Sequence, residues 1–173
     1  AFEMTGGEIP VIYARGNHEL KGKYAEELHE FVGAKGESFY YNVYLENIYG
    51  LVLEIGEDHD DDWWEYYDTA YYYEYNQKQF AMLSEEISKK EYETYQYRLV
   101  VCHIPPVFVN SRKNHVEIKD TLTSLLNQMN IDMCISGHQH DLLIFEPGVV
   151  KPYEKLYYNP LFSSKKSYNG YLT

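Results

Sequence analysis

Two histidines follow an apolar run in the stretch Ile131-Asp132-Met133-Cys134-Ile135-Ser136-Gly137-His138-Gln139-His140. The run over residues 131–135 predicts a short buried β-strand. Gly137 permits a tight turn after that strand, and on such a turn His138 and His140 can converge on one small region. Imidazole groups suit first-row metals such as Zn, Fe and Mn. The stretch predicts either a strand that ends in metal ligands or two polar residues in a surface loop.

Two other apolar runs end in the same kind of segment. Residues 10–14 precede Asn17 and His18, and residues 98–102 precede His103. Ligands of open α/β sheets bind outside the carboxyl ends of the strands. Three histidine-bearing strand ends therefore predict one metal site assembled from distant parts of the chain. Taken singly, His103 could be structural or solvated, and Asn17 could cap a helix.

The remaining chain alternates helix and strand patterns. Such alternation predicts an α/β fold, with a layered mixed β-sheet flanked by helices, in a single domain over residues 1–173. Apolar residues at helical spacing and runs rich in β-branched and aromatic residues set the expected elements. These are helices over 20–32, 75–90 and 116–129, a hairpin of strands 38–45 and 49–55, strands over 142–145 and 156–158, and an acidic aromatic loop over 57–68.

The composition narrows the class of partner. A net charge of −12 argues against nucleic acid, whereas a phosphorylated small molecule stays compatible because bound cations can invert the local field. No apolar run approaches the roughly 18 residues that span a bilayer, so no membrane partner is expected. Cys102 and Cys134 lie in apolar runs and are expected to be buried free thiols. The sequence does not assign a compartment.

Three short motifs carry a family resemblance. Gly16-Asn17-His18-Glu19, Val100-x-x-His103 and Gly137-His138-x-His140 resemble the last three motifs of the calcineurin-like metallophosphoesterases, a superfamily that includes the purple acid phosphatases. The resemblance covers roughly residues 8–145. It implies the C-terminal part of a phosphoesterase catalytic domain whose N-terminal strands are missing. Residue 1 is not Met, and we interpret it as a truncation point.

The resemblance also implies a role for each matching residue. Asn17, His103 and His138 would ligate the second of two metal ions, and His140 the first. His18 would act as the catalytic residue that contacts the phosphoryl oxygens or assists the leaving group. The ions would be divalent or trivalent Fe, Zn or Mn, sharing a bridging hydroxide that attacks phosphorus. The implied activity is hydrolysis of phosphomonoesters or phosphodiesters.

The sequence departs from the family pattern in its missing carboxylates. No Asp-x-His or Gly-Asp motif precedes Gly16, and the candidate ligands are all neutral. Two nearby cations repel strongly and need anionic ligands between them. We therefore expect this chain alone to be inactive, and its exposed sheet edge to pair with a second copy as a homodimer. The alternatives are a non-catalytic metal-binding pseudo-enzyme module and an interaction domain that uses the tyrosine-rich surface.

Overall fold

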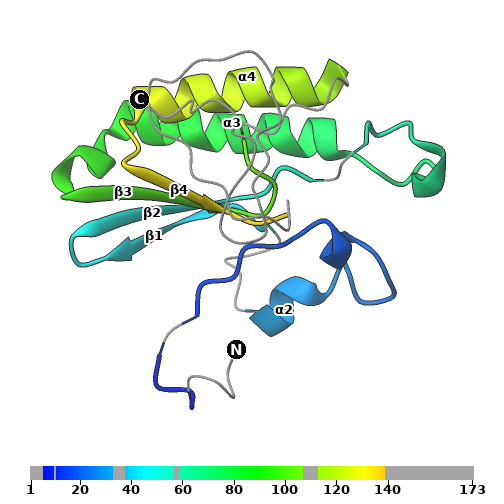
Figure 1. Ribbon diagram of the computed structural model, residues 1–173, viewed down its shortest axis with the longest axis horizontal. Helices are drawn as coiled ribbons and strands as arrows, with labels where there is room; N and C mark the ends of the chain where they lie inside the picture. The colour runs from blue at the N-terminus through cyan, green and yellow to red at the C-terminus, as the bar shows by residue number, and fades with distance from the viewer. Residues whose placement is uncertain (1–5, 10, 33–37, 57–58, 107–112, 139–173) are drawn as a thin grey trace, which may run out of the picture.

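A four-stranded sheet with two long helices on one face forms the body of the structure (Figure 1). This computed structural model describes residues 6–9, 11–32, 38–56, 59–106 and 113–138. The strands are β1 (Tyr41–Leu45), β2 (Ile48–Leu53), β3 (Tyr97–Cys102) and β4 (Met133–Ser136), in the order β1-β2-β3-β4. β1 and β2 are antiparallel, whereas β2, β3 and β4 run parallel. The predicted α/β class, the mixed sheet and the hairpin are confirmed.

Helices α3 (Tyr72–Lys89) and α4 (Lys113–Gln128) supply the apolar layer above the sheet. Each has an apolar stripe that faces the strands, because apolar residues recur every three or four positions. The Asp61 side chain caps the first turn of α3, since its two carboxylate oxygens accept the backbone N–H groups of Tyr72 and Tyr73 at 2.9 and 3.1 Å. The buried core includes Leu51, Leu53, Phe80, Leu83, Val100, Ile118, Leu122, Leu126 and Met129.

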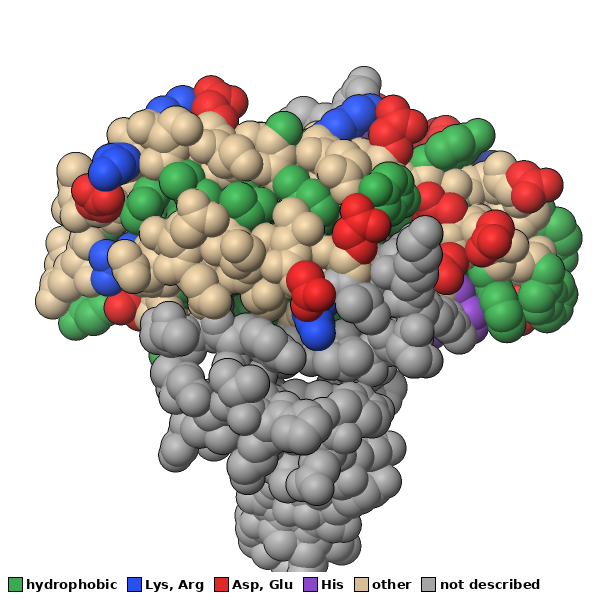
Figure 2. All heavy atoms as spheres, turned by 90° about the horizontal axis from the view of Figure 1, so that it is seen from above, with side chains coloured by type: hydrophobic (Ala, Val, Ile, Leu, Met, Phe, Trp, Pro, Cys, Tyr) green, Lys and Arg blue, Asp and Glu red, His purple; other side chains and the backbone are tan. Residues whose placement is uncertain are grey.

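The shorter elements are α2 (Leu28–Val32) and the 3-10 turns η1 (His18–Leu20), η2 (Trp64–Tyr66) and η3 (Glu91–Thr94). η2 belongs to the predicted acidic aromatic loop, of which residues 57 and 58 lie outside the described residues. The acidic and aromatic side chains of this loop gather at one end of the molecule, on the right of Figure 2. Trp64, Tyr67 and Tyr71 are exposed there.

Two predictions for the N-terminal part are wrong. Residues 11–16 form no strand, and Val11 and Ile12 are exposed. Local apolar character does not supply a partner strand, and this segment instead passes the sheet on the side away from α3 and α4 (Figure 1). The helix predicted over 20–32 is present only over its last residues, in α2. Gly22 takes a φ of +102°, outside the α-helical range, and the residues after it form turns closed by the hydrogen bonds Ala25 N–H to Gly22 O and Glu27 N–H to Tyr24 O.

The strand predicted over 131–135 is present but is only partly buried. β4 begins at Met133, and the Met133 and Ile135 side chains are 53% and 50% exposed. The helices cover one face of the sheet, so the side chains that alternate to the other face lose that cover. Pairing of a second copy along an exposed sheet edge stays a prediction. The strands expected at 142–145 and 156–158 lie outside the described residues.

The two cysteines are free thiols, as predicted, with Cys102 buried and Cys134 half-buried. Their Sγ atoms lie 3.9 Å apart on β3 and β4. Cys134 pairs in register with Val100, two residues before Cys102. With strands about 4.8 Å apart and a rise of about 3.3 Å per residue, their Cα atoms are separated by about 8 Å. A disulfide spans at most about 7 Å between Cα atoms, so bridging this pair would require the backbone of β3 or β4 to move.

Within the described part of the chain, every helix is too short or too polar to cross a membrane.

Candidate metal centre

The carboxyl ends of β3 and β4 bring two of the predicted ligands together. His103 directly follows Cys102, the last residue of β3, and His138 lies two residues after Ser136, the last residue of β4. The Gly137 N–H donates a hydrogen bond to the His103 carbonyl oxygen at 2.9 Å, which extends the strand pairing by one step. The imidazole rings of His103 and His138 are 5.2 Å apart between centroids and nearly perpendicular.

Asn17 joins this pair from a segment 86 residues away in sequence. Its side-chain Oδ1 lies 3.1 Å from His103 Nε2, and the residue is only 5% exposed. Ligands of one first-row metal ion, bound at about 2.1 Å, lie about 3.0–3.4 Å apart for angles between 90° and the tetrahedral value. The observed spacing therefore suits two neighbouring ligands of one metal ion. Without a metal, the Nε2–H tautomer of His103 can donate to Asn17 Oδ1.

Two glycines leave room for the His103 ring. A Cβ on Gly16 would lie 3.1 Å from the ring and 2.7 Å from Glu19 Oε2, and a Cβ on Gly137 would lie 3.3 Å from His103 Nδ1. The 2.7 Å contact is shorter than real Cβ contacts, and the contacts of 3.1 and 3.3 Å are tight enough that the neighbouring atoms would have to shift. The glycines of the first and third motifs therefore have a common physical purpose, which is close approach of two backbones to one imidazole.

Of the two remaining predicted site residues, the structure describes His18 and does not describe His140. His18 begins η1 directly after Asn17 and is exposed, so it lies at the surface beside the cluster. Glu19 turns back, and its Oε2 accepts the Gly16 N–H at 3.0 Å. His140 lies outside the described residues. The structure thus gathers Asn17, His103 and His138, with His18 adjacent.

An ion pair that sequence reasoning missed lies next to this cluster. Arg15 Nε and Nη2 donate to Glu54 Oε1 at 2.8 and 2.5 Å. Burial raises the pKa of the Glu54 carboxyl, and the Arg15 guanidinium opposes that rise. The sequence held one signal for Glu54. It directly follows the apolar run of β2, in the same way that His103 directly follows the apolar run of β3.

The described donors at the strand ends are neutral. They are two imidazoles and one amide oxygen, while Glu54 is paired with Arg15 and Glu19 with the Gly16 N–H. Among the residues that the structure describes, no group of three or more His, Cys, Asp or Glu side chains could hold a metal ion. This donor set fits part of the coordination shell of one first-row metal ion. It contains no negative charge that could offset the repulsion between two neighbouring metal ions.

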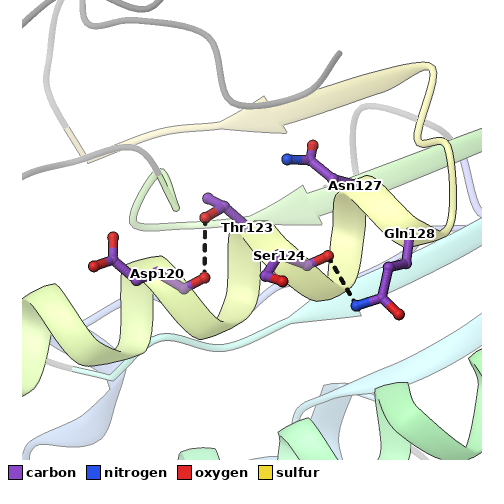
Figure 3. A pocket seen from close by; sticks show the side chains of 5 residues that line it. All are labelled: Asp120, Thr123, Ser124, Asn127 and Gln128. Atoms are coloured by element: carbon purple, nitrogen blue, oxygen red, sulfur yellow. Dashed lines mark hydrogen bonds between the residues drawn. The ribbon is translucent and has the colours of Figure 1, made fainter.

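A second candidate site is a shallow hollow along α4 (Figure 3). Two of its polar side chains bind their own helix, because Thr123 Oγ1 donates to the Lys119 carbonyl and Gln128 Nε2 to the Ser124 carbonyl. All its lining residues come from one helix, and Asp120 is its only ionisable group. We assign no chemistry to it. The lining residues are Asp120, Thr123, Ser124, Asn127 and Gln128.

Comparison with known proteins identifies the family. The family model described as calcineurin-like phosphoesterase matches residues 1–142, a range that contains all three motifs. Comparisons with curated proteins and with solved structures give no significant match. The purple acid phosphatase subtype and the position within a larger domain stay predictions. With three motif residues gathered at the strand ends and a family match over most of its length, the chain belongs to the calcineurin-like phosphoesterase family.

Proposed function

We propose that this chain supplies part of the metal and substrate site of a phosphoesterase that hydrolyses phosphomonoesters or phosphodiesters. The observation that carries the proposal is the 3.1 Å approach of Asn17 Oδ1 to His103 Nε2, beside His138. These side chains lie at the carboxyl edge of a parallel sheet, where α/β folds bind ligands. Membership in a metal-dependent phosphoesterase family gives this edge its chemistry.

Each residue has a defined task in this proposal. Asn17, His103 and His138 bind one metal ion through an amide oxygen and two imidazole nitrogens, and His140 binds a neighbouring ion. Such ions supply Lewis-acid stabilisation of phosphoryl charge and activate water. His18, exposed at the start of η1, contacts the phosphoryl oxygens or protonates the leaving group.

We further propose that the 173-residue chain alone holds one ion and is inactive as a phosphoesterase. The neutral described donors support this, because two cations a few ångströms apart repel each other and need carboxylates between them. One ion on neutral ligands keeps water activation and loses the paired stabilisation of the attacking and leaving oxygens.

Calorimetric titration of the metal-free chain with Zn²⁺ or Mn²⁺ tests the proposal. We expect one ion per chain, loss of that binding in His103→Ala, and unchanged binding in the control His29→Ala. His29 is a suitable control because it lies on α2 and its Nδ1 contacts the Glu26 carbonyl oxygen. Binding that persists in His103→Ala would contradict the site. Two tightly bound ions with rapid hydrolysis of an aryl phosphate would contradict the single-ion state.

The same titration bears on the non-catalytic alternative. If the chain is a metal-binding pseudo-enzyme, added carboxylates will not restore hydrolysis. A variant that introduces an aspartate at the site, Asn17→Asp, adds one negative charge without changing the side-chain length. We expect this variant to bind Mn²⁺ more tightly and to gain measurable aryl phosphate hydrolysis, whereas a pseudo-enzyme gains affinity alone.

A further inference from the structure

We propose that the buried Arg15–Glu54 ion pair is a positioning device that holds Asn17 against His103. This inference rests on the proposed metal site and adds two residues to it. Neither residue is a ligand. Their effect on the site passes through the backbone of residues 15–17, because only Gly16 separates Arg15 from Asn17.

The first step is that Asn17 stands on a segment with little structure of its own. Residues 11–16 form neither strand nor helix, so no ladder of backbone hydrogen bonds fixes them. Among the residues that the structure describes, two side-chain contacts tie the segment to the sheet. The Tyr41 hydroxyl donates to the Tyr13 carbonyl oxygen at 2.7 Å, and Arg15 binds Glu54. The second contact lies closer to Asn17 along the chain.

The second step is that Glu54 is a rigid anchor. Leu53 of β2 pairs with Cys102 of β3, so Glu54 and His103 leave the sheet at the same edge. The buried Gln79 side chain holds the Glu54 backbone on both sides, since its Oε1 accepts the N–H at 2.8 Å and its Nε2 donates to the C=O at 2.9 Å. Glu54 is 2% exposed, so its carboxylate is enclosed by packed neighbours on a fixed stretch of backbone.

The third step is that Arg15 is confined from a second direction. Its guanidinium carbon lies 3.8 Å from the centroid of the buried Phe39 ring, a geometry that favours a cation over an aromatic face. The Phe39 N–H is itself held by the Tyr75 hydroxyl of α3 at 2.9 Å. The planar, delocalised guanidinium can stack on this ring and bind the carboxylate together, whereas the compact ammonium of lysine cannot reproduce both contacts.

The consequence is a continuous chain of contacts from the helical layer to the metal ligand. It runs from Gln79 to Glu54, then to Arg15, and through Gly16 to Asn17. Loss of the ion pair frees the segment, so Asn17 Oδ1 leaves His103 Nε2 for part of the time. A metal ion that needs both atoms at once then binds more weakly, because it must pay to order them.

The test combines a metal-free readout with a metal-bound one. ¹⁵N NMR of the histidine-labelled, metal-free chain at one fixed pH reports the His103 tautomer, which the contact with Asn17 Oδ1 sets toward Nε2–H. Co²⁺ titration followed by visible absorption reports affinity. For Arg15→Met and Glu54→Gln we expect loss of the Nε2–H preference, and Co²⁺ binding weakened by roughly tenfold. Asn17→Ala gives the reference for complete loss of the contact.

Two further variants separate positioning from stability. Arg98→Met removes a more exposed arginine–carboxylate pair, with Asp132, from the opposite end of β3. It should leave the tautomer and the Co²⁺ affinity unchanged. Arg15→Met/Glu54→Met removes both buried charges together, a change that buried ion pairs often tolerate. We expect this double variant to fold and still to lose the tautomer preference, which keeps the test decisive if a single variant fails to fold.

The proposal is overturned if folded Arg15 and Glu54 variants retain the His103 tautomer and bind Co²⁺ within about twofold of the parent chain. It is equally overturned if Arg15→Met leaves both readouts intact and instead weakens competition by inorganic phosphate, since Arg15 would then contact the substrate. If the parent chain binds no Co²⁺, the proposed function fails, whereas the tautomer readout still decides the positioning role.

Discussion

The Tyr49 hydroxyl donates a hydrogen bond to Glu86 Oε2 at 2.7 Å inside the core, which joins β2 to the last turns of α3. Asn42 Nδ2 of β1 donates to the same oxygen at 3.0 Å, and Lys89 Nζ donates to Oε1 at 3.1 Å. Burial and the nearby Glu86 carboxylate raise the pKa of the Tyr49 phenol far above its usual value, so it remains a donor throughout the physiological range. One carboxylate thus connects two strands and a helix.

Removing this hydroxyl should destabilise the fold. Tyr49→Phe keeps the buried ring and deletes a hydrogen bond to a charged acceptor, so we expect a loss of about 1.5–3 kcal/mol in the free energy of unfolding. Urea denaturation followed by circular dichroism measures it. The control is Tyr97→Phe, whose hydroxyl is exposed at the start of β3 and should change stability by less than about 0.5 kcal/mol. Equal losses in the two variants would contradict the buried network.

The same carboxylate gives a pH dependence of defined sign. Although burial opposes its ionisation, hydrogen bonds from Tyr49, Lys89 and Asn42 hold the pKa of Glu86 below its usual value. Its stabilising contribution is therefore complete above the unfolded pKa of about 4.3, and it is lost as the pH falls through the lower folded value. We expect the parent chain to lose more stability between pH 6 and pH 3 than Glu86→Gln does.

Comparing the parent chain with Glu86→Gln cancels the acid response of the other carboxylates, because both proteins contain them. The measurement is the difference in urea midpoint at each pH. An identical acid response in Glu86→Gln would show that Glu86 titrates at the same pH in the folded and unfolded states.

The elements that sequence patterns predict well are those whose pattern is long and whose partners are close. The stripe of Phe80 and Leu83 gives α3, and the short Glu46–Asn47 turn gives the hairpin. The apolar run before Gly16 fails because its pattern is local, whereas a strand needs a partner whose position the run does not encode. Gly22 shows a second limit, since its positive φ ends a helical pattern that the apolar spacing continues.

The candidate site divides in the same way. The proximity of His103 and His138 could be predicted, because each follows a strand and the carboxyl ends of parallel strands share one edge. Asn17 reaches the same place although the apolar run before it forms no strand. The Arg15–Glu54 ion pair could not be predicted in this way, because its two residues lie 39 positions apart and no short-range sequence pattern links them. The pair becomes visible only when the segment before Gly16 is placed beside β2.

Asp61 should set the stability of the first turn of α3. Its carboxylate accepts the N–H groups of Tyr72 and Tyr73, which have no partner within the helix. We expect Asp61→Ala to cost about 1 kcal/mol in the free energy of unfolding, measured by thermal or urea denaturation. Asp62→Ala, at an exposed neighbouring position, is the matched control and should have no measurable effect.

Gly16→Ala should damage the metal site more than it damages the fold. The added methyl group would lie 3.1 Å from the His103 ring and 2.7 Å from Glu19 Oε2. The Glu19 side chain is flexible and can move away, but the imidazole is held between two backbones and must shift with the segment. Overpacking of this kind costs about 1–3 kcal/mol, which unfolding measurements will show.

Because the shift separates Asn17 Oδ1 from His103 Nε2, Zn²⁺ affinity measured by calorimetry should fall by at least tenfold. Gly137→Ala, with a longer closest contact of 3.3 Å to the same ring, should cause a smaller loss of affinity. If the two variants rank in the opposite order, the approach of the Asn17 segment to His103 does not determine metal binding.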